Sequence, residues 1–154
     1  MPHIILAIMN FIKSKYTVIT LAVLSIALCF FPVLSAEITT GEAYTSVIRG
    51  YNLLEFSAFG IVFLIAPMLV PTILYGCQSR AAKELELIAL LLGSNVCYAH
   101  SIHNAWRWLN EIGAALIEVK MSMLLYPIAF IALCIVAIIQ NYCKNNAGKV
   151  LSIY

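Results

Sequence analysis

The chain has 154 residues, of which 63% are hydrophobic and 10% charged, and its formal net charge is +2. A charge this small gives no reason to expect nucleic acid as a partner. The sequence contains no Asp, which excludes mechanisms that require one.

The charged residues all lie outside four runs of the sequence, each about 20 residues long or longer. Because about 20 apolar residues let a helix cross the hydrocarbon core of a bilayer, we predict an all-α membrane protein with four transmembrane helices in an up-down bundle. The connections are too short for a soluble domain, so residues 1–154 are predicted to form a single integral membrane domain. The predicted spans are 16–36, 56–78, 85–106 and 121–143.

The placement of Lys and Arg predicts the orientation of the bundle, because cytoplasmic loops are enriched in both. One side of the proposed membrane carries Lys13, Lys15, Arg80, Lys83, Lys144 and Lys149. The other side carries only Arg49, Arg107 and Lys120, together with Glu37, Glu42, Glu55, Glu111 and Glu118. Both termini are therefore expected in the cytoplasm. The compact chain without an N-x-S/T acceptor favours a multi-pass protein of the cell inner membrane.

The first span has two readings. A cleaved signal peptide would fit Lys13 and Lys15 ahead of an apolar stretch that ends near Ser35. The stretch is longer than a typical signal core, so we favour a retained span. It is predicted to be helical to its outer end, because in lipid only a helix satisfies its own backbone. A polar loop with a turn at Gly41 is expected to follow.

The second span contains Pro67 and Pro71 on one helical face, and the two are predicted to kink the helix. Each proline lacks an N–H, so the carbonyls of Phe63 and Pro67 lose their helical partners. Such carbonyls line a cavity or hold a cation in many transporters. In the simpler interpretation, which we favour, neighbouring hydroxyls or packing meet them.

The outer half of the third span collects polar residues, which are predicted to form a polar face between helices. Polar groups in hydrocarbon are costly unless paired, so this face should point into the bundle and form hydrogen bonds there. Its residues are Asn95, Tyr98, His100, His103, Asn104 and Arg107.

The same segment raises the alternative of a metal site. His100 and His103 lie one turn apart, and Cys97 would be a further ligand. The third histidine, His3, is predicted to lie across the membrane. Both candidate histidines project from one helix, so they cannot hold one haem from opposite sides. The five cysteines form no C-x-x-C motif and are expected to be packing residues. We expect no cofactor.

No motif for a hydrolase, a P-loop or a dinucleotide site is present, and we expect no enzymatic activity. The expected partners are the lipid bilayer and either another membrane protein or further copies of the chain. The first hypothesis is a small inner-membrane protein that acts through contacts with other membrane components. Two alternatives stay open: an immunity-type protein against a pore-forming toxin, on size and topology alone, and a metal- or haem-binding redox subunit centred on His100 and His103.

Overall fold

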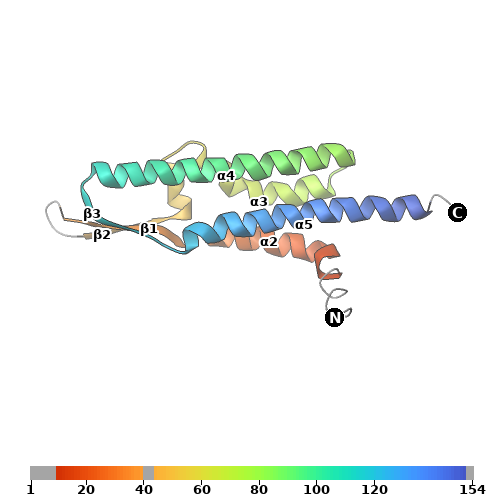
Figure 1. The fold of residues 1–154 in the computed structure, drawn as a ribbon, viewed down its shortest axis with the longest axis horizontal. Coiled ribbons are helices and arrows are strands. Elements are labelled where there is room, and N and C mark those ends of the chain that lie inside the picture. Colours follow the sequence, from red (N-terminus) through yellow and green to blue (C-terminus); the bar gives the residue numbers. More distant parts are fainter. Residues whose placement is uncertain (1–9, 40–43, 152–154) are drawn as a thin grey trace.

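The computed structural model describes residues 10–39 and 44–151, and side chains as far as Lys144. The molecule is mostly helical, at 73%, and carries a three-stranded sheet at one end (Figure 1). Its elements in chain order are α2 (Lys15–Leu28), β1 (Pro32–Ile38), β2 (Tyr44–Arg49), the 3-10 helix η1 (Gly50–Glu55), α3 (Gly60–Tyr75), α4 (Arg80–Glu111), β3 (Ala114–Val119) and α5 (Ser122–Leu151).

Helices α2 to α5 lie side by side and alternate in direction (Figure 1). The connections α2–α3 and α4–α5 therefore meet at one end, where they form the sheet. Within the described residues, two helices are long and apolar enough to cross a membrane, namely α4 and the Ser122–Lys144 part of α5. The other two, α2 and α3, are apolar but shorter.

The first predicted span needs correction at its outer end. Helix α2 stops at Leu28, and β1 begins at Pro32, inside the predicted span 16–36. Proline cannot donate the backbone bond that would continue the helix. Beyond it, the backbone groups are met by neighbouring strands on both sides. The predicted loop is partly strand β2, and Gly41 lies outside the described residues.

The sheet is antiparallel, in the order β2-β1-β3, with β1 in the centre. Its alternate residues separate into two faces. One face joins the hydrophobic core of the bundle, through Leu34, Ala36, Ile48 and Ile117. The opposite face carries Ser35, Glu37, Thr45, Val47, Leu116 and Glu118. No strand was predicted from the sequence, so the sheet is a correction to the all-α fold expected.

The remaining helices differ from the predicted spans mainly in their ends. Helix α4 begins before the predicted 85–106, because Ser79 caps it by accepting from the Ala82 N–H at 3.3 Å. It also runs on to Glu111. Helix α3 begins only at Gly60 and continues through both prolines, and α5 extends past 143 to Leu151.

Small residues line the buried faces of the helices. They allow the backbones to approach closely, as in membrane helix packing. They are Ala22, Ser25, Ala66, Ser94, Ser101, Ala105 and Ala137.

Candidate functional site

The polar face predicted on the third span lies on α4, mostly at the edge of the bundle. Of its six residues Tyr98 is buried, while His100, His103 and Arg107 are exposed. The buried side of α4 is a neighbouring line at three- and four-residue spacing, where small side chains permit close packing. That line consists of Leu87, Ser94, Tyr98, Ser101, Ala105 and Leu109. The expected orientation of the polar face into the bundle is therefore wrong for the exposed members.

Asn104 ties this edge of α4 to the segment that leads into α3. Its side-chain nitrogen donates to the Phe56 carbonyl at 3.1 Å and lies 3.2 Å from Nε2 of His100. The His100 ring meets Phe59 edge-on, with 6.1 Å between centroids. Asn95 donates instead to a carbonyl one turn earlier in its own helix, at 2.7 Å. Asn95 is thus satisfied within α4, whereas Asn104 reaches the segment before α3 and the Tyr98 hydroxyl donates to the Met123 carbonyl on α5 at 2.9 Å.

Arg107 lies one turn beyond Asn104, toward the end of α4 that leads into the sheet. It pairs with Glu111 across one turn, at 3.4 Å, and both side chains are about two-thirds exposed. Trp108 packs against the Phe56 ring, with 5.3 Å between centroids. An aromatic residue beside an exposed ion pair is typical of an interfacial anchor.

The candidate metal ligands do not come together. Within the described residues, no three His, Cys, Asp or Glu side chains lie close enough to hold an ion. His100 is engaged with Asn104, while His103 is exposed and Cys97 is half-buried. His3 lies outside the described residues. All five cysteines are free thiols, and Cys29 and Cys134 are buried in the core.

Sequence reasoning missed the buried aromatic cluster in the centre of the bundle. Its rings belong to Phe63, Tyr98, Tyr126 and Phe130. Tyr126 is 1% exposed; its hydroxyl donates to the Phe63 carbonyl, and Ser94 Oγ lies 3.2 Å from it. Pro67 has no N–H to offer that carbonyl, so the tyrosine supplies the missing donor. The sequence offered one signal for this cluster, a tyrosine within a predicted span, because a buried tyrosine hydroxyl needs a hydrogen-bond partner.

The outward face of the sheet forms an open groove of about 260 Å³. Its apolar walls are Val47 on β2 and Leu116 on β3, which are 45% and 51% exposed. Between them run Ser35 and the exposed Glu37 of β1. Each outer strand also presents one free edge in the described sheet. An apolar groove beside open strand edges is a surface on which another chain can dock.

Glu118 at one end of this groove is held ionised. The Lys120 ammonium donates a hydrogen bond to its carboxylate and adds a favourable charge, and the Ser35 hydroxyl donates at 3.4 Å. These contacts keep the pKa of Glu118 below its ordinary value, mainly through Lys120.

We expect Lys120→Gln to raise the pKa of Glu118 toward the ordinary range, and Ser35→Ala to raise it less. Because the folded-state pKa is lowered, the stabilisation is present above the unfolded pKa and is lost as the pH falls through the folded pKa. A carbon-13 NMR titration of the Glu118 carboxyl measures the shift. An unchanged titration in Lys120→Gln would contradict the pairing.

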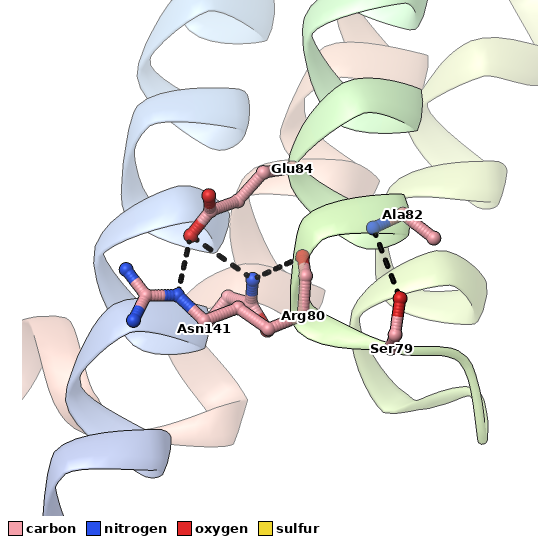
Figure 2. A network of polar contacts seen from close by, with 5 residues as sticks. All are labelled: Ser79, Arg80, Ala82, Glu84 and Asn141. Carbon is pink, nitrogen blue, oxygen red and sulfur yellow. Dashed lines mark hydrogen bonds and ion pairs between the residues drawn. The ribbon is translucent and has the colours of Figure 1, made fainter.

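The opposite end of the bundle is held by a polar network between α4 and α5 (Figure 2). Arg80 Nε donates to Glu84 at 2.8 Å, and Asn141 donates to the Arg80 carbonyl at 3.2 Å. The Arg80 guanidinium also lies over the Tyr142 ring, 4.4 Å from its centroid. Beside this network, where α2, α3 and α5 meet, lies a cavity of about 470 Å³.

Comparisons with protein-family models, with curated proteins and with solved structures found no match for this chain.

Proposed function

We propose that the protein is a four-span bundle of the cell inner membrane with both termini in the cytoplasm. It acts through contacts with another membrane component and not by catalysis. The observation that carries the proposal is the groove on the outward face of the sheet. It is the exposed, mixed apolar and polar surface that would project beyond the lipid.

The distribution of side chains supports placement in a bilayer. Large apolar residues cover the outside of helices α2 to α5, while the buried interfaces combine small residues such as Ala66 with large side chains such as Phe63 and Leu133. In a lipid environment such exposed residues need no further cover, whereas in water they would form an extensive apolar surface. Representative exposed residues are Ile19, Val23, Ile61, Met68, Ile88, Val96, Ile128 and Ile135.

The two shorter helices are compatible with four spans. At 1.5 Å per residue, α2 and α3 rise about 21 and 24 Å, against a hydrocarbon core of about 30 Å. Residues 10–13 form a separate helical turn ahead of α2, from which the extended Ser14 divides them, and η1 precedes α3 on its outer side. A remaining mismatch is met by local thinning of the bilayer, at a modest cost per ångström.

The interior favours a structural role over chemistry. Among the described side chains, every buried nitrogen and oxygen atom has a hydrogen-bond partner. The hydroxyl of Tyr126, the deepest polar group near the prolines, is engaged with the Phe63 carbonyl. A broken-helix transport site would need free polar groups facing a cavity. The redox alternative is weaker for a related reason, because His100 and His103 face outward.

The immunity-type hypothesis is a special case of this proposal, with a pore-forming toxin as the partner. It differs in where the contact lies. A toxin helix in the bilayer would meet the lipid-facing side of the bundle, whereas our proposal places the contact on the sheet. Crosslinking distinguishes the two locations.

We expect a photo-crosslinking amino acid at Val47 or Leu116 to capture a partner in intact cells. Both positions are exposed on the groove, so substitution leaves the core unchanged. The matched control is Ile135, which is 48% exposed on the lipid-facing side of α5. Adducts are measured by gel mobility and mass spectrometry. A second copy of the 17.0 kDa chain would appear as a dimer.

The outcomes separate the hypotheses. A protein adduct from Val47 and Leu116, but not from Ile135, supports contact through the sheet. An adduct from Ile135 alone would overturn that location and favour a partner within the bilayer. No adduct from any of the three positions would remove the proposal of a contact function.

A further inference from the structure

The cavity at the inner end of the bundle, away from the sheet, differs from the sheet groove in charge. Three lysines line it: Lys13 in the turn before α2, Lys15 at the start of α2, and Lys144 on α5. Its walls also include apolar groups from Leu74 and Tyr75 at the end of α3. At about 470 Å³, it falls within the range of cavities that bind small molecules.

Gln140 builds this cavity by joining three helices. It is 8% exposed, and its nitrogen donates to the carbonyls of Ile12 and Ser14, at 2.6 and 2.8 Å. Its oxygen accepts from the Tyr75 hydroxyl at 3.3 Å. These bonds hold the turn that carries Lys13 and Lys15 against α5. The lysines are therefore presented from a fixed backbone.

The three ammonium groups have no carboxylate partner in the described part of the chain. All ion pairs found there involve other residues. Glu84 and Glu86, at the same end of the bundle, are engaged with Arg80 and Gln78. The sequences 1–9 and 145–154 contain no Asp or Glu either. Three cations around one cavity without an anion create a site of positive potential.

The aromatic contacts leave hydrogen-bond donors free on these lysines. The Lys144 ammonium lies over the Tyr75 ring and the Lys15 ammonium over the Tyr16 ring, each at 5.4 Å from the centroid. A ring engages one side of an ammonium group, which has three N–H donors. The remaining donors are available to a phosphate oxygen.

We propose that this cavity binds an anionic phospholipid of the cytoplasmic leaflet. The lysines hold the phosphate, and the hydrocarbon lies against Leu74 and Tyr75. The combination of cations and apolar walls favours a phosphate attached to a hydrocarbon chain over a free anion. The inference depends on the proposed orientation of the bundle, but not on the partner at the sheet.

Lipid binding is tested with the full-length protein in detergent, by native mass spectrometry with phosphatidylglycerol and with phosphatidylcholine. We expect the wild type to prefer phosphatidylglycerol. Each Lys→Gln substitution at positions 13, 15 and 144 should lower the affinity about fivefold, and the triple variant about a hundredfold. Lys120→Gln, at the sheet end, is the matched control and should keep the wild-type affinity.

Two results would overturn the proposal. One is a triple variant that retains the preference, which would mean that the cavity does not hold the lipid. The other is displacement of the lipid by inorganic phosphate at equal concentration, which would identify a free-anion site. All three lysines are exposed, so their variants should fold, and circular dichroism checks this. Crosslinking from Val47 in the triple variant tests the proposed function separately.

Discussion

Tyr126→Ala is expected to destabilise the protein by about 3 kcal/mol, the low end for aromatic-to-alanine changes in cores. The low end applies because in the proposed bilayer setting the loss is mainly of packing, without a large hydrophobic transfer term. The side chain is 1% exposed and contacts three other aromatic rings. Unfolding in mixed detergent and sodium dodecyl sulfate, followed by tryptophan fluorescence, measures the change.

Tyr126→Phe measures what the hydroxyl alone contributes to stability. It keeps the ring but leaves the Phe63 carbonyl without a donor, at an expected cost of about 1–2 kcal/mol. The cost should shrink in a Pro67→Ala background, because the new N–H at position 67 can complete the helical bond to the same carbonyl. This double-mutant cycle tests whether the tyrosine compensates for the proline.

Tyr98→Phe is the control for the cycle. The Tyr98 hydroxyl donates to the Met123 carbonyl at 2.9 Å, which Pro67 does not affect. Its cost should therefore be the same with and without Pro67→Ala. Equal costs for Tyr126→Phe in both backgrounds would contradict the compensating role and reopen the proline pair as a cavity-lining feature.

The helical part of the fold was predictable because long apolar segments are a strong signal in the sequence. Runs of about 20 residues without a charge identify the segments that become α2 to α5, although their ends differ from the predicted spans. The sheet was not predictable from the same signal. The segment from Pro32 to Ala36 is as apolar as the end of a predicted membrane helix. It forms a strand because it pairs with residues far along the chain, such as Ile117. Pairing of this kind leaves no local pattern.

The candidate site was predicted in composition but not in orientation. Polar residues on α4 were expected to face the bundle because hydrocarbon disfavours them. The structure places Asn104 and His100 in the half of α4 nearer the sheet, where the segment before α3 provides partners through the Phe56 carbonyl and the Phe59 ring. The polar residues that α4 does bury include Ser94 and Ser101, whose small side chains allow close helix packing. The buried face of α4 therefore mixes small hydroxylated residues with the large side chains of Leu87, Tyr98 and Leu109.

Gly50→Ala is expected to destabilise the protein by about 1–3 kcal/mol, the range for overpacked sites. A Cβ at this position would lie 2.8 Å from both Cα and the carbonyl oxygen of Cys29. These are backbone atoms and cannot rotate away. Hydrogen bonds from the Gly50 N–H to the Phe31 carbonyl (3.2 Å) and from the Tyr51 N–H to the Cys29 carbonyl (2.9 Å) hold the two segments together.

Gly93→Ala should stabilise the protein, and it is therefore the matched control for the destabilising Gly50→Ala. A Cβ at Gly93 meets nothing within 4 Å, and alanine in a helix interior is favoured over glycine by about 0.5–1 kcal/mol. The same unfolding assay compares the two. Because Gly50 joins β2 to η1, its substitution should also displace the sheet and weaken crosslinking from Val47. A neutral Gly50→Ala with unchanged crosslinking would mean that the sheet does not depend on this close approach to α2.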